Sequence, residues 1–198
     1  MKSLSLNVPD EQAQAFAKEL TTLMKKHGVE VENKEALDAM RPITERVKTF
    51  EDACAVLGDN HPLVHQYAAV YDTLNDNDVC FGDFKDTIAY MKLRIIIATL
   101  NEGWQPTFSD EERRYYPWFM FYTKEEQDAM DEEERSRVLG RSSVSANANA
   151  GVAYSDTGYA SSLTSTYSGG RLCFKNRELA EYAGQQFLAI YADFLIGF

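Results

Sequence analysis

The sequence predicts an α+β fold, in which a helical layer packs on a small antiparallel sheet. Apolar residues recur every three or four positions between residues 43 and 104, as they do along one face of a helix. Residues 115–122 (YYPWFMFY) are dense in the aromatic side chains that favour strands. After Asn176 the chain again carries a helical apolar stripe, which predicts a long amphipathic C-terminal helix lying across the sheet.

Residues 1–42 are predicted to form a separate strand–helix–strand unit, followed by an α+β domain at 43–198. Residues 3–8 and 29–31 alternate apolar and polar side chains, which is typical of short strands. Between them lies an apolar-striped helix that Gly28 ends. At 198 residues the chain has the length of one domain with a small N-terminal appendage.

Three helices are expected in the first half of the main domain. Thr49 is placed to cap one over residues 50–57, and a second covers 61–74. Asp83 is placed to cap the third, whose apolar residues extend around most of its circumference between 84 and 100. We therefore expect this third helix to be the buried centre of the fold.

The second half of the main domain supplies strands, a charged helix and one unusual segment. Pro117 indicates either that the aromatic strand lies at the edge of the sheet or that the strand starts at this proline. Residues 171–174 are a further expected strand. Residues 124–137 predict one helix with seven acidic residues. Residues 142–170 are rich in Ser, Ala, Gly, Thr, Asn and Tyr, with Asp156 as the one charged residue. Because this segment has few large aliphatic residues, we expect it to contribute little to a core.

Composition and charge restrict the class of protein. With 44% hydrophobic and 26% charged residues the chain is globular, and its net charge of −11 disfavours approach to nucleic-acid phosphates. The three cysteines are far apart in the sequence and indicate reduced thiols and a cytoplasmic location. Residues 1–8 lack the apolar stretch of a signal peptide, and the most apolar run, 95–100, is far shorter than a membrane span. We therefore expect no membrane association.

Candidate catalytic and metal-binding residues are few. His61 and His65 are four residues apart, which on a helix places both on one face, as in many metal sites. However, Pro62 lies between them and no third ligand is close in sequence, so surface or helix-capping histidines are the preferred interpretation. Consecutive carboxylates fan out around a helix, and no nucleophile elbow or phosphate-binding glycine loop is present. We predict a protein that is not an enzyme and that binds no metal and no cofactor.

Aromatic residues in two places are the candidate binding residues. Tyr116 and Trp118 are candidates on the aromatic strand, because alternation sends half of its side chains to the core and half outward. Outward members would be able to stack bases, as in proteins that bind single-stranded nucleic acid. Tyr154, Tyr159 and Tyr167 lie among small polar residues of the Ser/Tyr/Gly-rich segment, a composition typical of recognition surfaces. The alternative for that segment is a surface loop or a β-meander with no binding role.

Five short motifs resemble an uncharacterised family encoded by gut Bacteroidales and their phages or prophages. The motifs are 50–54 (FEDAC), 100–104 (LNEGW), 115–119 (YYPWF), 171–175 (RLCFK) and 178–182 (ELAEY). The resemblance runs intermittently from about residue 49 to the C-terminus and does not include residues 1–48. It implies a phage or mobile-element origin, and it brings no catalytic residues to carry over.

These observations together predict a non-enzymatic, phage-encoded binding protein with a protein partner, either a virion component or a host factor. Its contact surface would be the Ser/Tyr-rich segment with the neighbouring aromatic strand, and its location the host cytoplasm or the virion. The alternative is a protein that binds single-stranded nucleic acid through the aromatic strand 115–122. The aromatic residues favour this alternative, and the net charge disfavours it.

Overall fold

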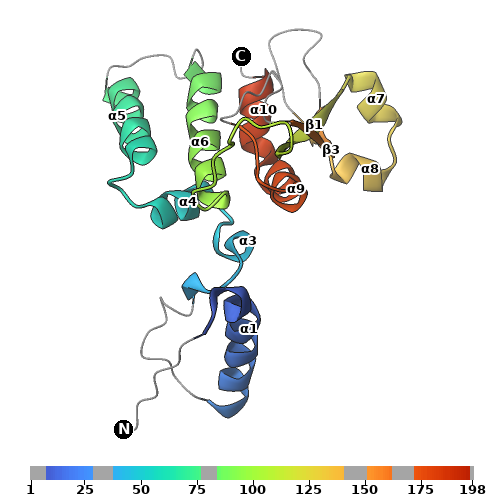
Figure 1. Cartoon of the computed structure of the whole chain (residues 1–198). Helices are drawn as coiled ribbons and strands as arrows, with labels where there is room; N and C mark the ends of the chain where they lie inside the picture. The colour runs from blue at the N-terminus through green and yellow to red at the C-terminus, as the bar shows by residue number, and fades with distance from the viewer. Residues whose placement is uncertain (1–7, 29–37, 77–83, 141–150, 162–171, 197–198) are drawn as a thin grey trace. The chain divides into compact units, whose positions relative to one another are not determined.

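The computed structural model describes residues 8–28, 38–76, 84–140, 151–161 and 172–196 (Figure 1). The chain forms two compact units, residues 1–48 and 49–198, which are described separately below. The division lies between Lys48 and Thr49, whereas the sequence suggested one after residue 42.

The first unit contains helix α1, Asp10–His27, and the one-turn helix α3, Ile43–Arg46. Gly28 ends α1 with a left-handed backbone (φ 63°), a conformation that glycine adopts without steric cost, and its N–H donates to the carbonyl of Met24. The helix of this unit is therefore present with the predicted stop signal. The strands expected at 3–8 and 29–31 lie outside the described residues, apart from Val8.

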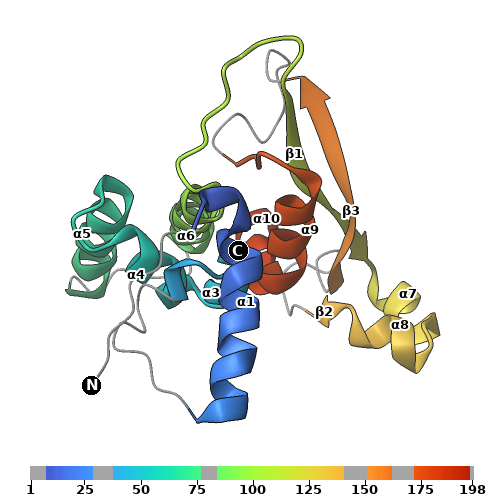
Figure 2. The same cartoon turned by 60° about the horizontal axis from the view of Figure 1, so that its bottom comes forward.

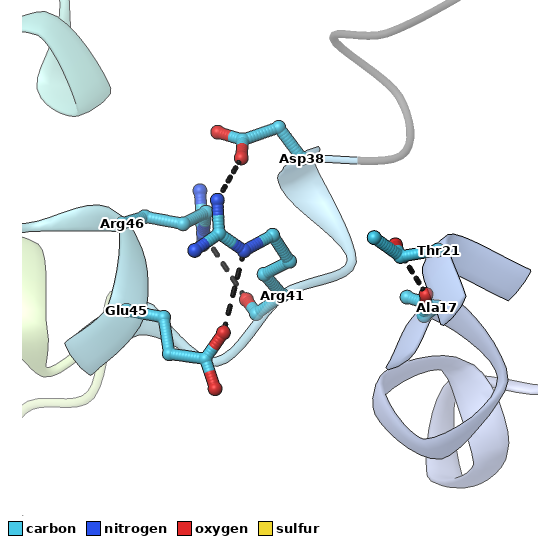
Figure 3. A network of polar contacts seen from close by, with 6 residues as sticks. All are labelled: Ala17, Thr21, Asp38, Arg41, Glu45 and Arg46. Atoms are coloured by element: carbon cyan, nitrogen blue, oxygen red, sulfur yellow. Dashed lines mark hydrogen bonds and ion pairs between the residues drawn. The ribbon is translucent and has the colours of Figure 1, made fainter. Parts of the chain in front are cut away.

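An arginine links the segment before α3 to α3 itself (Figure 3). Arg41 donates from Nη1 to Asp38 at 2.8 Å and from Nε to Glu45 at 3.3 Å, while Arg46 donates to the carbonyl of Arg41 at 3.2 Å. The hydrogen bond to Asp38, followed by that to Glu45, raises the pKa of Arg41 above its usual value. These groups are solvent-exposed, so the ion pairs orient the turn and contribute little to stability.

Helix α6, Lys85–Leu100, is the centre of the second unit, as the sequence predicts. It packs against α4 (Phe50–Leu57), α5 (Pro62–Asp76) and α10 (Leu188–Ile196), and Figure 1 shows it between α5 and α10. Its apolar side chains are buried around most of its circumference, because it has neighbours on several sides. Thr49 caps α4 in a reciprocal capping box with Asp52, as predicted. The predicted cap of α6, Asp83, lies outside the described residues.

The sheet has three antiparallel strands in the order β1–β3–β2: β1 is Arg113–Tyr122, β3 is Gly151–Ser161 and β2 is Leu139–Gly140. β1 and β3 form a long two-stranded ribbon, with a register shift between Trp118 and Phe119. The prediction of a strand at 171–174 is wrong for the described residues 172–174. They form an isolated bridge, in which Phe174 and Tyr115 are joined by two backbone hydrogen bonds, and the third strand of the sheet is β2 instead.

The charged segment after β1 is two short helices, α7 (Lys124–Ala129) and α8 (Glu132–Ser136), and the prediction of one helix over 124–137 is wrong. Asp131 has an extended backbone and caps α8 in a capping box with Glu134. Met130, also extended, ends α7. A second start signal in the sequence therefore divides the acidic residues between two helices.

The C-terminal helix packs across the sheet, which confirms the predicted α+β architecture. It consists of two segments, α9 (Arg177–Gln186) and α10 (Leu188–Ile196), separated at the buried residue Phe187. Asn176 caps α9 by accepting from the N–H of Leu179, as predicted. Figure 2 shows α9 and α10 beside the β1–β3 ribbon.

The expectation that the Ser/Tyr/Gly-rich segment contributes little to the core is wrong for its described part. β3 is the central strand of the sheet, and its residues Val152 and Thr157 are almost completely buried. Small side chains allow this strand to lie under the helices and between its neighbours. The strand has few large aliphatic residues because the helices and the two neighbouring strands pack closely against it.

Candidate functional site

The β1–β3 ribbon has two faces with different surroundings. Strand alternation places Pro117, Tyr154 and Thr157 on one face, which we call the inner face. Helix α9 covers it closely: a methyl group added to Gly184 would come within 2.7 Å of Pro117 Cβ and within 2.5 Å of the Tyr154 ring. Position 184 therefore requires glycine, because only a residue without a side chain lets the helix approach the sheet this closely.

Tyr116, Trp118 and Met120 alternate on the opposite face of β1, and we call these three residues the outer aromatic patch. The rings of Tyr116 and Trp118 lie with centroids 6.1 Å apart, tilted by 49°. Trp118 is 57% exposed and Met120 is 49% exposed. The patch thus presents apolar side chains along one face of a hydrogen-bonded strand.

Gly158 of β3 allows the patch to form. It pairs with Tyr116 in the strand register, and a methyl group on Gly158 would collide with the Trp118 indole and the Tyr116 ring. The two aromatic side chains therefore reach across to the neighbouring strand, where Gly158 has no side chain to block them.

The surroundings of the patch are acidic. β1 continues directly into α7 and α8, whose segment 124–137 carries seven acidic and three basic residues. Gln127 of α7 donates to the carbonyl of Tyr122 at 3.2 Å and holds α7 at the end of β1. Asp156, which pairs with Trp118 in the register, is ion-paired with Arg177 at 2.6 Å, so the acidic character comes from the segment 124–137. A partner of this surface would therefore meet an apolar centre beside a negatively charged rim.

The structure brings two of the five predicted binding residues together, namely Tyr116 and Trp118. Tyr154 lies on the inner face, where its ring is against Gly184 and its hydroxyl is 2.8 Å from that of Thr157. Tyr159 is at the far end of the ribbon, with the Arg113 guanidinium 4.8 Å from its ring. Tyr167 lies outside the described residues.

Met120 and Gly158 are site residues that the sequence analysis missed. Met120 follows from the alternation that selects Tyr116 and Trp118, so this signal was present in the sequence. Gly158 could be found only from the register of β3 against β1, because a glycine in a Gly-rich segment carries no signal by itself.

No cluster suited to metal binding occurs in the described part of the chain: no three residues among His, Cys, Asp and Glu are grouped to hold an ion. His61 caps α5, since its Nδ1 accepts from the N–H of Leu63 at 3.3 Å, and His65 is exposed, which confirms the capping and surface interpretation. Burial raises the pKa of Cys54 and of Cys173, so both thiols stay protonated near neutral pH.

None of the described helices is both long enough and apolar enough to cross a lipid bilayer. The class that fold and surface define is an α+β protein with an exposed aromatic patch on a two-stranded ribbon. Comparison with known protein families, with curated proteins and with solved structures gives no match to this chain.

Proposed function

We propose that this chain is a non-enzymatic binding protein and that its outer aromatic patch is the contact surface for a protein partner. The observation that carries the proposal is the exposure of Trp118 and Met120 beside the Tyr116 ring on a rigid strand. Contiguous exposed apolar side chains are rare on surfaces that make no contacts. Trp and Tyr are also the residue types most often found as energetic hot spots in protein interfaces.

Charge favours a protein partner with a basic rim around an aliphatic or aromatic centre. The acidic segment 124–137 is next to the patch in the fold, and opposite charges there would speed association and orient the partner. The patch is built on paired strands, so little conformational entropy would be lost on binding.

The resemblance to proteins of gut Bacteroidales and their phages gives the proposed partner a biological context. A phage-encoded chain of this kind would act in the host cytoplasm or as part of the virion. The partner would then be a virion component or a host factor. Charge and patch chemistry, not the resemblance, define the surface to be tested.

The test is site-specific photo-crosslinking followed by affinity measurement. A photoreactive phenylalanine replaces Trp118 in one chain and Phe108, an equally exposed aromatic residue outside the patch, in another. We expect one partner protein to crosslink to the variant with the photoreactive residue at position 118 and not to the variant with it at position 108. Once purified, this partner should bind the Trp118→Ala variant more weakly than the wild type. Equal crosslinking from both positions, or binding that Trp118→Ala does not weaken, would show that the patch is not the contact surface.

The second candidate function is binding of single-stranded nucleic acid by the same aromatic side chains. The neighbouring rings of Tyr116 and Trp118 favour it, since nucleic-acid bases stack on exposed aromatic side chains. The acidic rim and the net charge of −11 oppose it. Fluorescence anisotropy with a labelled oligothymidylate distinguishes the two: a salt-sensitive sub-micromolar affinity would replace our proposal by this one.

A further inference from the structure

A groove of about 610 Å³ lies in the second unit. None of the residues that line it belongs to the outer aromatic patch. Its walls come from the turn between α4 and α5, from the C-terminal half of α6 and from the loop at 101–108. Leu57 and Leu63 form one apolar wall, and Trp104 and Phe108 come from the loop. This volume is in the range of small-molecule binding sites.

The loop that forms one wall is fixed in an unusual conformation. Glu102 (φ 49°) and Phe108 (φ 59°) are the non-glycine residues with a left-handed backbone among the described residues. Such conformations cost free energy and persist where surrounding contacts hold them. Here the Asn101 side chain donates to the carbonyl of Cys173 at 2.9 Å, and Lys175 pairs with Glu102 at 3.0 Å. These contacts fix the start of the loop at Asn101 and Glu102, and Phe108 at its other end is more than half exposed at the groove.

Arg94 gives the groove a positive charge. The side chain lines the groove and is partly buried, yet it has no hydrogen bond or ion pair within the described part of the chain. Each of the other arginines described there has a hydrogen bond, an ion pair or a ring contact. The positive charge of Arg94 is therefore not neutralised by an acidic side chain in the part of the chain that the structure describes.

His61 adds a hydrogen-bond donor to the same groove. Because its Nδ1 accepts from the N–H of Leu63, the neutral ring carries its proton on Nε2. A guanidinium and one imidazole N–H suit the two oxygens of a carboxylate. A phosphate would bring more charge and need more donors in a protein of net charge −11.

We propose that this groove binds a small aromatic carboxylate. The carboxylate accepts from Arg94 and from His61 Nε2, and the aromatic part of the ligand packs between Trp104 and Leu63. The proposal is independent of the protein-binding function of the outer aromatic patch.

The chain offers a built-in control for testing this, because its two tryptophans lie in the two different sites. The ¹⁵N-labelled full-length protein is titrated with 3-phenylpropionate and, separately, with the uncharged 3-phenylpropanamide, while both indole N–H signals are followed by NMR. We expect the acid to shift the Trp104 signal saturably, the Trp118 signal to stay in place, and the amide to bind at least about tenfold more weakly, since a charge-assisted hydrogen bond contributes that much.

Arg94→Gln should lower affinity for the acid about tenfold or more, to the level of the amide, and leave amide binding unchanged. Arg41→Gln, which removes an exposed arginine of the first unit, is the matched control and should leave both affinities unchanged. Absence of a saturable Trp104 shift up to about 10 mM acid, well above a weak millimolar dissociation constant, would overturn the proposal. Equal affinity for acid and amide would overturn it as well, and this comparison needs no variant to fold.

Discussion

The two faces of the β1–β3 ribbon are made by the same strands, yet they differ in what covers them. On the inner face, Tyr154 and Pro117 lie against Gly184 so closely that α9 has no room for a side chain there. On the outer face, the patch residues Trp118 and Met120 remain about half exposed. Each face depends on one glycine, Gly184 in the helix and Gly158 in the strand.

The difference teaches that aromatic content alone does not reveal the role of a strand. Packed against a helix, an aromatic ring contributes to the free energy of folding, because burying it removes apolar surface from water. Left exposed on the opposite face, a ring of the same type contributes little to folding and is available for a partner. The part of the inner face that α9 covers therefore contributes to stability, and the outer aromatic patch is available for the proposed binding.

The largest expected contrast is between aromatic truncations in the core and on the patch. Phe174→Ala removes a fully buried ring beside β1 and should lower the free energy of unfolding by about 3–5 kcal/mol. Trp118→Ala removes a ring that is more than half exposed and should cost less than about 1 kcal/mol. Urea denaturation of both variants measures the contrast, and equal midpoints would remove the distinction between buried and exposed aromatics.

A smaller contrast compares one substitution on the two faces. Gly184→Ala should destabilise by about 1–2 kcal/mol despite the higher helix propensity of alanine, because the methyl group meets the Tyr154 ring and Pro117. Gly158→Ala should change stability by less than about 0.5 kcal/mol, because exposed Trp118 can swing away. Thermal unfolding of the two variants checks this, and a Gly184→Ala protein as stable as the wild type would contradict the close packing of α9.

A third prediction concerns tyrosine burial and is measured at alkaline pH. Burial raises the pKa of Tyr67 to about 12 and that of Tyr191 further, from a usual value of 10.0. The folded state thus keeps these protons where the unfolded state loses them, so their contribution is complete below pH 10 and is lost as pH rises through 12. Tyr191→Phe should flatten the decline of stability above pH 10, while exposed Tyr159→Phe, the control, should not. Identical alkaline profiles for all three proteins would show that Tyr191 is not buried.

Tyr191→Phe has a second expected effect at neutral pH. The hydroxyl of Tyr191 is buried and has no hydrogen-bond partner among the described residues. Removing it should leave stability unchanged or raise it by up to about 1 kcal/mol, since a buried polar group without a partner carries a desolvation cost. A loss of more than 1 kcal/mol in urea denaturation would indicate that the hydroxyl has a partner in solution.

The helices were predictable from the sequence because their signals are local. Thr49 with Asp52, Asn176 and Gly28 mark helix ends through contacts within a few residues, and the apolar residues of α6 follow its period. The division of the acidic helix was also encoded locally, by Asp131 and Glu134, but seven acidic residues in one run concealed it.

The faces of the ribbon could not be predicted in the same way, because they depend on pairing between segments far apart in the sequence. β3 has few large aliphatic side chains, so nothing in its pattern fixes which residues face the core. The register shift between Trp118 and Phe119 also interrupts the regular alternation by which residues of β3 face one side or the other. The sequence pattern therefore did not reveal that Tyr154 lies on the inner face. Nor did it reveal that Gly158 lies beside Trp118, which follows only from the pairing of β3 with β1.

The central claim is that binding and stability belong to opposite faces of the ribbon, and the most direct measurement is the affinity of the crosslinked partner for Gly158→Ala. This variant keeps every aromatic residue but displaces Trp118 and Tyr116. The account predicts an affinity loss of about 30-fold, equivalent to a hot spot of about 2 kcal/mol, at unchanged stability. Wild-type affinity in Gly158→Ala, together with lost affinity in Gly184→Ala, would contradict the account by moving the contact surface to the inner side of the ribbon.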